Sequence, residues 1–389
     1  MQMYVYFGLL RLVFLAKFHF GGCVAIGRFP RAVRGKAAER MSAVSTMMDV
    51  ARKAGVSIAT VSRVLSGQAK VAPELAARVS NAVRELAYEP NFTAQNLRRN
   101  ESRTLVIITP NITNPYYANI MAGIAQGAQE RGYSSFIFNT EGKKELEEQI
   151  LERLKKHQAD GAILLAAELG SDWIYDYAKE YPVVQCSEFD PHFPVPRVCV
   201  DNYQAAQDVM AYLISLGHTR IGTISIENSF HSTASRLRGY RDALEKAGLP
   251  VTEDYIRFAT QGYTFKMGLK AARSLLAQEK RPTALFCVSD MLALGAIAAA
   301  REMGFHVPND VTVVGFDDVE YTTMFHPYVT TIVQPCFQIG RTAVDLVCGL
   351  IQRQPVPLEV ILPHELMVRE SSGPYDRHLA NFASCVTGC

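Results

Sequence analysis

The chain has 389 residues, of which 48% are hydrophobic and 20% are charged. This length exceeds one ordinary domain, and the composition is that of a globular protein with sizeable cores, which excludes a fibrous or disordered chain. The net charge of +2 hides an asymmetry: residues 45–100 carry eight basic and four acidic side chains, and residues 101–389 carry 25 and 33. A basic N-terminal part followed by an acidic remainder predicts that only the N-terminal part contacts a polyanion. An ordinary solvated charged surface is the alternative explanation of the basic residues.

The first forty residues combine an apolar, aromatic run with a basic stretch. Two cations interrupt the run at residues 3–20, and the forty residues carry seven basic side chains and one acidic. A membrane span needs about 18 unbroken apolar residues, and the stretch lacks a convincing signal-peptidase site. We expect residues 1–44 to be a mispredicted or disordered extension, and we expect the true start to be Met41. A membrane or targeting segment is the alternative.

Residues 45–89 have the pattern of a helix-turn-helix headpiece. Val50 and Ala54 give a short first helix its apolar face, and Gly55 supplies the tight turn that lets a second helix cross the first. Ser57 is placed to cap the second helix. A third helix is expected from residue 73 to residue 86.

On the second helix, Val61, Val64 and Leu65 recur at helical spacing and are expected to pack inward. The outer face is then small and polar with one long cation, which fits a DNA major groove of about 12 Å. Any one of its serines or arginines could equally be ordinary surface. The candidate DNA contacts of the headpiece are Thr46, Ser57, Ile58, Ala59, Thr60, Ser62, Arg63 and Ser66.

The string Asp-Val-Ala-x-x-Ala-Gly-Val-Ser-x-x-Thr-Val-Ser-Arg-Val-Leu, which ends at Leu65, resembles the headpiece of the LacI/GalR family of bacterial repressors almost letter for letter. The resemblance implies that Ile58 and Ala59 occupy the main base-reading positions. Apolar side chains there would contact thymine methyl groups.

Residues 90–102 are similar to the hinge helix and linker of that family. Pro90 ends the preceding helix, and Asn91 can cap a new helix that is too short to persist alone. The resemblance implies that Leu97 wedges into the minor groove and that Arg98 lies near phosphates; a buried leucine is the alternative for Leu97. The hinge candidates are Asn91, Ala94, Leu97 and Arg98.

Residues 103–372 alternate short apolar runs rich in β-formers, among them residues 161–166 and 311–316, with amphipathic helical stretches. Such alternation predicts parallel sheets with helices on both faces. The runs are too many for one sheet, so we expect two lobes. The region resembles the periplasmic-binding-protein-like effector domain of the same family, which also mediates dimerisation. The tail at residues 373–389 contains no leucine heptads.

Ligands of open parallel sheets bind beyond the carboxyl ends of the strands. The residues that follow the predicted strands include carboxylates, an arginine and aromatic rings, which suit a hydroxyl-rich ligand with a flat face. The candidate effector contacts are Asn114, Tyr116, Tyr117, Glu188, Asp201, Phe230, Ser232, Arg236, Tyr263 and Asp290.

The family resemblance gives some of these residues a role. It implies that Arg236 grips the effector, that Asp290 binds ring hydroxyls and that Tyr263 stacks; Asp290 as a helix cap and Tyr117 as core are the alternatives. Phe230 replaces an arginine that purine-binding members use, which argues against a purine corepressor. The body is most similar to the cytidine-responsive nucleoside repressor subfamily, and the ligand class stays open between nucleoside and sugar.

The sequence therefore predicts an all-α helix-turn-helix headpiece and hinge helix followed by a two-lobed α/β effector domain. We expect a cytoplasmic, homodimeric transcriptional repressor that binds double-stranded, pseudo-palindromic operator DNA under control of a small sugar or nucleoside. An exported or cytosolic sugar-binding protein without a DNA role is the alternative, but it would have no helix-turn-helix.

Catalysis, cofactors and metals are not expected. The sequence has no G-x-G-x-x-G motif after a predicted strand. It also shows no recognisable pair of a catalytic nucleophile and a general base. The eight cysteines include no C-x-x-C pair and lie near no histidine at metal-ligand spacing. Reduced thiols are the simplest account of them.

Overall fold

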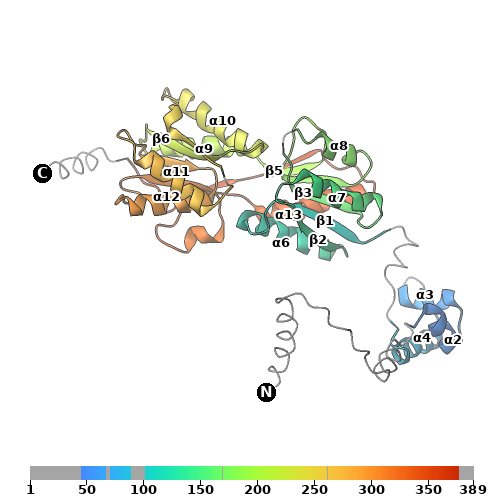
Figure 1. The fold of residues 1–389 in the computed structure, drawn as a ribbon. Helices are drawn as coiled ribbons and strands as arrows, with labels where there is room; N and C mark the ends of the chain where they lie inside the picture. The colour runs from blue at the N-terminus through green and yellow to red at the C-terminus, as the bar shows by residue number, and fades with distance from the viewer. Residues whose placement is uncertain (1–44, 67–70, 89–100, 169, 261, 376–389) are drawn as a thin grey trace, which may run out of the picture. The chain divides into compact units, whose positions relative to one another are not determined.

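The computed structural model describes residues 45–66, 71–88, 101–168, 170–260 and 262–375 (Figure 1). The chain divides into two compact units, Met1–Phe92 and Thr93–Cys389. The expected N-terminal extension and the four hinge candidates Asn91, Ala94, Leu97 and Arg98 lie outside the described residues, so their predicted roles stay predictions.

The described part of the first unit is a three-helix headpiece of α2 (Met47–Ala54), α3 (Ile58–Ser66) and α4 (Pro73–Glu85). Thr46 caps α2 through a capping box with Asp49, and Gly55 ends the helix in the left-handed region at φ 62°. The Arg78 guanidinium of α4 donates to the carbonyl oxygen of Ala54 at 2.5 Å and ties α4 to this turn. The core consists of Val50, Ala51, Ala54, Val61, Val79, Ala82 and Tyr88.

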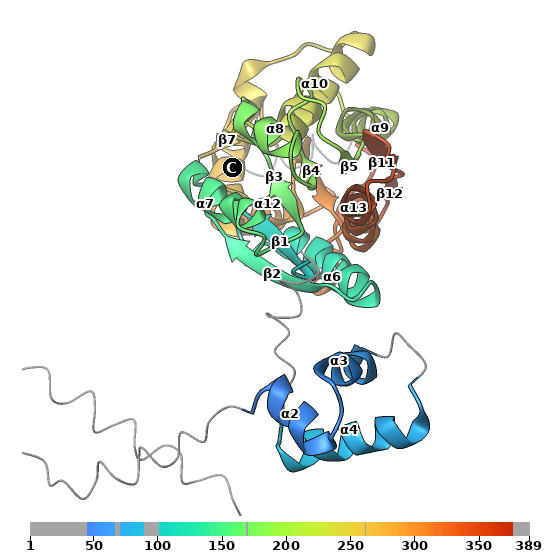
Figure 2. The ribbon, with the colours of Figure 1, turned by 90° about the vertical axis from the view of Figure 1, so that its right-hand side faces the viewer.

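The second unit contains two lobes, each built on one six-stranded sheet (Figures 1 and 2). The sheet of the first lobe has the order β11-β5-β4-β3-β1-β2 and is parallel throughout. Its strands are β1 (Thr104–Thr109), β2 (Ser134–Asn139), β3 (Gly161–Ala166), β4 (Val183–Glu188), β5 (Arg197–Val200) and β11 (Glu359–Leu362). Its helices α6 (Pro115–Glu130) and α13 (Cys336–Ile351) cover one face, and α7 (Lys144–Lys155) and α8 (Asp172–Ala178) cover the other.

The sheet of the second lobe has the order β12-β10-β9-β8-β6-β7. Its strands are β6 (Ile221–Ile226), β7 (Ile256–Ala259), β8 (Ala284–Cys287), β9 (Thr312–Asp317), β10 (Thr330–Val333) and the antiparallel edge strand β12 (Glu365–Met367). Helices α9 (Asn202–Ser215) and α10 (His231–Lys246) cover one face, and α11 (Phe265–Leu276) and α12 (Asp290–Glu302) cover the other. Two short 3-10 turns are η1 (Glu253–Tyr255) and η2 (Glu320–Thr323).

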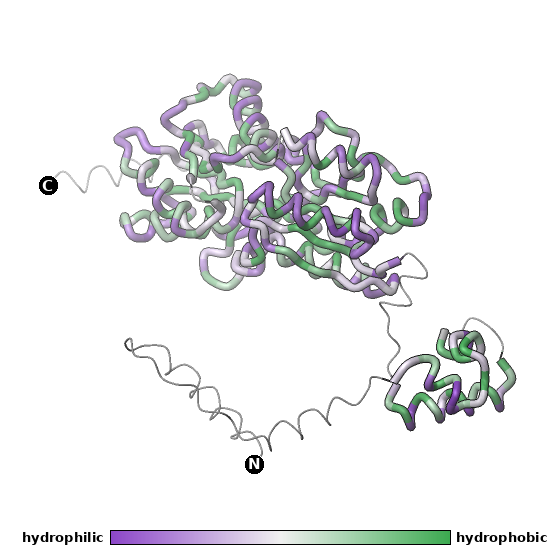
Figure 3. The backbone as a smooth tube through the Cα atoms, turned by 45° about the vertical axis from the view of Figure 1, so that its right-hand side comes forward, coloured by the Kyte–Doolittle hydropathy of each residue, from purple (hydrophilic) through white to green (hydrophobic). Residues whose placement is uncertain are grey.

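The chain passes between the lobes three times: from β5 to α9, from β10 to α13 and from β11 to β12. The apolar side chains of both sheets are buried under their helices, and the hydropathy colouring changes repeatedly along the helices that cover them (Figure 3). The predicted fold class, a helical headpiece before a two-lobed α/β domain with parallel sheets, is confirmed.

Glycines allow α11 and α12 to pack at close range. A Cβ atom on Gly295 of α12 would lie 2.2 Å from the carbonyl oxygen of Phe265 and 2.6 Å from the backbone nitrogen of Leu269, both on α11. Because these neighbours are backbone atoms and cannot move independently of α11, an added methyl group would force the two helices apart.

We expect Gly295→Ala to lower the free energy of unfolding by about 1–3 kcal/mol, the usual cost of overpacking a core. Urea unfolding followed by circular dichroism measures the loss. Lys270→Ala, at an exposed position of α11, serves as the control and is expected to stay within about 0.5 kcal/mol of the unchanged protein. Equal stability of the Gly295→Ala variant and the unchanged protein would contradict this packing.

Candidate DNA-binding face and ligand cavity

Helix α3 presents the predicted DNA-reading positions outward. Val61 is fully buried in the headpiece core, and Val64 and Leu65 pack partly against it. This orientation leaves Ile58 42% exposed and Ala59 exposed beside it at the start of the helix. A helix with small exposed residues in its first turn is the shape that enters a major groove.

Hydroxyl groups hold the start of each helix of the motif. The backbone nitrogen of Thr60 donates to Ser57 Oγ at 3.2 Å, so Ser57 caps α3 as the sequence predicts. The Thr60 hydroxyl lies 2.9 Å from the same Oγ, and Arg63 Nε donates to the carbonyl oxygen of Ala59 at 3.3 Å. Thr46 is exposed at the cap of α2.

The remaining headpiece candidates lie on the same helix. Ser62 is half-buried, and Ser66 is the last residue of α3. Contacts of these residues with DNA stay predictions, as do those of the hinge.

A small cavity lies where the carboxyl ends of strands from both lobes meet. Asn114 and the two tyrosines that follow it come after β1, and Glu188 ends β4 of the same lobe. The second lobe contributes the first turns of α10, the segment after β7 and the end of β9. The lining residues are Asn114, Tyr116, Tyr117, Glu188, Ser232, Arg236, Tyr263 and Asp317.

The structure thus brings together seven of the ten effector candidates and adds Asp317. Asp317 is the last residue of β9, a strand that the sequence places at residues 311–316. Its position directly after a predicted strand was a signal that would have found it.

The two tyrosines that line the cavity from the first lobe, Tyr116 and Tyr117, are buried. Tyr116 Oη lies 2.6 Å from Ser187 Oγ and donates to Gln334 Oε1 at 3.2 Å. The rings of Tyr116 and Tyr117 are 5.3 Å apart. Burial raises the pKa of both phenols well above the usual value, so both are neutral hydroxyl groups near neutral pH.

Glu188 joins the two lobes. Its carboxylate accepts a hydrogen bond from the backbone nitrogen of Ser232 at 3.2 Å and a second from the Ser232 hydroxyl, in the first turn of α10. Burial raises the pKa of Glu188 to about 7, although the Ser232 hydroxyl and the Arg236 charge act in the opposite direction.

Arg236 is the cation of the cavity and is only 5% exposed. Its Nε donates to Asn202 Oδ1 at 2.9 Å, its Nη1 donates to the carbonyl oxygen of Val288 at 2.6 Å, and its guanidinium carbon lies 3.6 Å from the ring centroid of Phe316. Burial raises the pKa of Asp317 above its usual value, although the positive charge of Arg236 acts in the opposite direction. Asp317 also accepts a hydrogen bond from Gln334 Nε2 at 2.8 Å.

Three effector candidates do not line this cavity. Asp290, fully buried in α12, accepts hydrogen bonds from Val319 N at 2.9 Å and Thr331 Oγ1 at 2.6 Å, while Ser289 is the residue that caps the helix. Asp201 is exposed and caps α9. Phe230 precedes α10 and lines a different cavity.

The cavity has a volume of about 20 Å³, which is room for about one water molecule. A sugar or nucleoside therefore requires side chains or lobes to separate. The bonds between Glu188 and Ser232 span the lobes, so a separation of the lobes breaks them.

Glu188→Gln is expected to change how stability depends on pH. Since the folded pKa of about 7 lies above the ordinary 4.5, the folded state holds this proton more tightly, and the free energy of unfolding falls as the pH rises through that interval. The variant lacks this contribution, so its stability relative to the unchanged protein should rise from pH 4.5 to about pH 7 and then level off. Urea unfolding at a series of pH values tests this; parallel profiles of the two proteins would contradict it.

Both units match models of one protein family. Residues 102–370 match the model described as periplasmic binding proteins and sugar binding domain of the LacI family, and residues 46–91 match bacterial regulatory proteins, lacI family. The chain therefore belongs to the lacI family of bacterial regulatory proteins, as predicted.

Two curated relatives match most of the chain. The chain is 38% identical over 337 residues to the HTH-type transcriptional repressor CytR of Escherichia coli (strain K12), covering 86% of this chain and 98% of that protein. It is 34% identical over 331 residues to catabolite control protein A of Priestia megaterium, covering 84% and 99%.

Two solved structures of regulators are also similar to this chain. The Lac repressor dimer bound to operator and the anti-inducer ONPF superimposes with a TM-score of 0.78 at 27% identity, covering 85% of this chain and 99% of that one. A complex of the transcriptional regulator CelR with cellobiose gives 0.64 at 30% identity, covering 84% and 100%.

The chain is thus a DNA-binding transcriptional regulator, and the match of the headpiece favours this function over a binding protein without a DNA role. In the part of the chain that the structure describes, no helix has the length and apolar character needed to cross a membrane. Within the same residues, no cluster of three or more potential ligand side chains could hold a metal ion.

Proposed function

We propose that this regulator is a cytoplasmic repressor that binds its operator as a homodimer, and that a nucleoside or sugar held between the lobes controls its operator affinity. The observation that supports the proposal most strongly is the interlobe cavity, which is lined by seven of the effector-binding candidates predicted from the sequence. The same chain has a helix, α3, with exposed residues at the predicted DNA-contacting positions. Catalysis is not part of the proposal, since the family consists of regulators.

The side chains of the cavity favour a hydroxyl-rich ligand. Glu188 and Asp317 can accept hydrogen bonds from ring hydroxyls, Arg236 can donate to ring oxygens, and Tyr117 and Tyr263 offer flat faces. The ribose operon repressor of Escherichia coli (strain K12) is 35% identical over 327 residues, covering 82% of this chain and 98% of that protein. Pentose-containing ligands are therefore the first to test, as free sugars and as nucleosides.

The lobes supply the means of control. A ligand that displaces Ser232 from Glu188, or replaces that bond, favours one lobe arrangement over another. Only such a differential affinity can shift an equilibrium between two conformations. The hinge helices would form on DNA in one arrangement and not in the other.

Homodimerisation explains the symmetry of the target. Two headpieces, one from each subunit, would meet two half-sites about one helical turn apart. The Lac repressor, which resembles this chain, is a dimer on its operator.

Selection from a random pool of double-stranded DNA tests the DNA half of the proposal. The full chain should enrich a sequence with two-fold symmetry, and its affinity should fall steeply with salt because phosphate contacts release counterions. Enrichment of asymmetric or unrelated sequences would contradict it. A thermal-shift screen of sugars and nucleosides then identifies the ligand, because a ligand of the folded state raises the melting temperature.

A further inference from the structure

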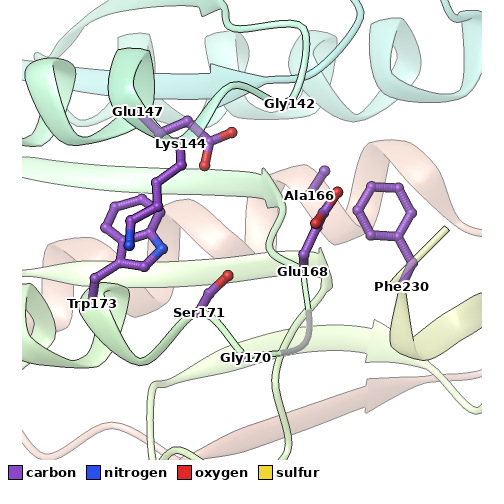
Figure 4. A pocket seen from close by; sticks show the side chains of 9 residues that line it. All are labelled: Gly142, Lys144, Glu147, Ala166, Glu168, Gly170, Ser171, Trp173 and Phe230. Atoms are coloured by element: carbon purple, nitrogen blue, oxygen red, sulfur yellow. The ribbon is translucent and has the colours of Figure 1, made fainter.

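A second cavity lies beyond the carboxyl ends of β2 and β3 of the first lobe, and Phe230 of the second lobe completes its lining (Figure 4). Its volume is about 180 Å³, slightly above the ~150 Å³ that accommodates a benzene molecule in a protein core. It shares no lining residue with the interlobe cavity. The lining residues are Gly142, Lys144, Glu147, Ala166, Glu168, Gly170, Ser171, Trp173 and Phe230.

The innermost acid of this cavity is Glu147 on α7, which is only 6% exposed. The Thr140 hydroxyl donates to Glu147 Oε1 at 3.0 Å; for Oε2 there is no hydrogen bond from the described residues. Figure 4 shows the carboxylate turned into the cavity. A charged donor that enters this space would therefore meet a carboxylate oxygen to which no side chain of the described residues donates, and pairing lowers the cost of a buried charge.

No cation within the described residues pairs with the two acids of the cavity. Glu168 stands exposed at the rim. The Lys144 ammonium lies 5.8 Å from the ring centroid of Trp173 and 3.7 Å from Glu148 Oε1, so it is directed toward other groups. The cavity is consequently acidic and is flanked by the rings of Trp173 and Phe230 (Figure 4).

We propose that this cavity binds a small organic cation that carries a primary amino or guanidino group. Charge-assisted hydrogen bonds from an ammonium or guanidinium group satisfy carboxylates such as Glu147 and Glu168. Aromatic faces attract cations, and the apolar parts of the wall accept a short methylene chain. A divalent metal ion suits the site poorly, because calcium needs six or more oxygen ligands and magnesium an octahedron.

The ligand would contact both lobes. Phe230 precedes α10, and Ser232 two residues later holds Glu188 of the first lobe. Occupancy of this cavity thus gives the regulator a second input, through residues that do not line the interlobe cavity.

Isothermal titration calorimetry of the full chain tests the proposal with 1,4-diaminobutane and methylguanidine as probes. The neutral isostere 1,4-butanediol and magnesium chloride, at matched ionic strength, are the comparison ligands. We expect the two organic cations to bind and the diol and magnesium to give no saturable heat. Saturable binding of the diol with equal affinity, tighter binding of magnesium, or no binding of either cation to the folded protein overturns the proposal.

Two variants locate the site. Glu147→Gln keeps the acceptor for Thr140 and should weaken cation binding at least about tenfold, and Glu168→Gln, at an exposed position that cannot disturb the core, should weaken it about threefold. Glu145→Gln, an exposed acid of the same helix, is the control and should change the affinity less than about twofold. Unchanged affinity in both site variants, or in Glu168→Gln alone if Glu147→Gln does not fold, overturns the assignment.

The pH dependence provides a second readout. Burial raises the pKa of Glu147 to about 7; the Thr140 hydrogen bond opposes this rise and the charge of Glu168 adds to it, and Lys144 is the other charged group of the cavity. A bound cation favours the ionised form, so cation affinity should increase between about pH 6 and about pH 8. The Glu147→Gln variant should lose most of this increase. An equal increase in both proteins contradicts a role of Glu147.

Discussion

Ala59→Glu is expected to reduce operator affinity at least about 100-fold, a cost of about 2.7 kcal/mol. Ala59 is exposed beside Ile58 at the start of α3, so a carboxylate there would face phosphates and the acceptor atoms of base edges. The headpiece should fold normally, because an acidic residue in the first turn of a helix is favourable. Fluorescence anisotropy with the selected duplex measures the loss, and circular dichroism checks the fold.

Asn81→Glu is the matched control for this change. It introduces the same charge at an exposed position of α4 in the same headpiece. Because salt screens distant charges, we expect less than about a fivefold loss. If both variants lose affinity equally, net charge and not the α3 face governs binding. If Ala59→Glu binds as well as the unchanged protein, α3 does not read the operator.

The second large effect concerns the interlobe cavity. Asp317→Asn should reduce the affinity for the nucleoside or sugar found by the screen at least about tenfold, because a charge-assisted hydrogen bond contributes about 1.5–3 kcal/mol. Asp317 lines the cavity, and its carboxylate is held by Gln334. Operator affinity without ligand should be unchanged, since the headpiece is untouched. Calorimetry gives the ligand affinity, and anisotropy gives the operator affinity.

Asp290→Asn is the informative partner variant. In the unchanged protein, the Asp290 carboxylate accepts hydrogen bonds from Val319 N and Thr331 Oγ1. We therefore expect the substitution to lower the free energy of unfolding by more than it lowers the free energy of ligand binding. The family resemblance instead gives Asp290 a direct role in ligand binding. A greater loss of ligand affinity in Asp290→Asn than in Asp317→Asn, at unchanged stability, would favour that role and contradict ours.

The central strands could be predicted because parallel strands covered on both faces read as continuous apolar runs. β3 is buried at every position, and its predicted bounds coincide with the observed ones. β11 has exposed and half-buried residues in alternation over only four positions, and β12 has three residues, so neither carries a distinctive pattern. Such edge strands form because tertiary packing places them beside a neighbour.

The choice between carboxylates could not be made from the sequence. The position of a residue after a strand predicts that it lies near the cavity edge, but not which way its side chain turns. Asp290 turns toward Thr331 of β10 and is buried there, whereas Asp317 reaches the cavity. This difference depends on contacts across neighbouring strands, which the order of residues along one strand does not contain. The acids of the second cavity, Glu147 and Glu168, likewise meet only after α7 packs on the sheet.

The most direct test of ligand-controlled DNA binding is one anisotropy titration of the selected operator with the full chain, with and without a saturating concentration of the ligand found by the screen. The account predicts that the ligand changes operator affinity at least about fivefold, the low end of typical coupling between sites. It also predicts that the change disappears in Asp317→Asn, whose ligand-free operator affinity stays normal. A ligand shown to bind in the interlobe cavity that leaves operator affinity unchanged would contradict the account.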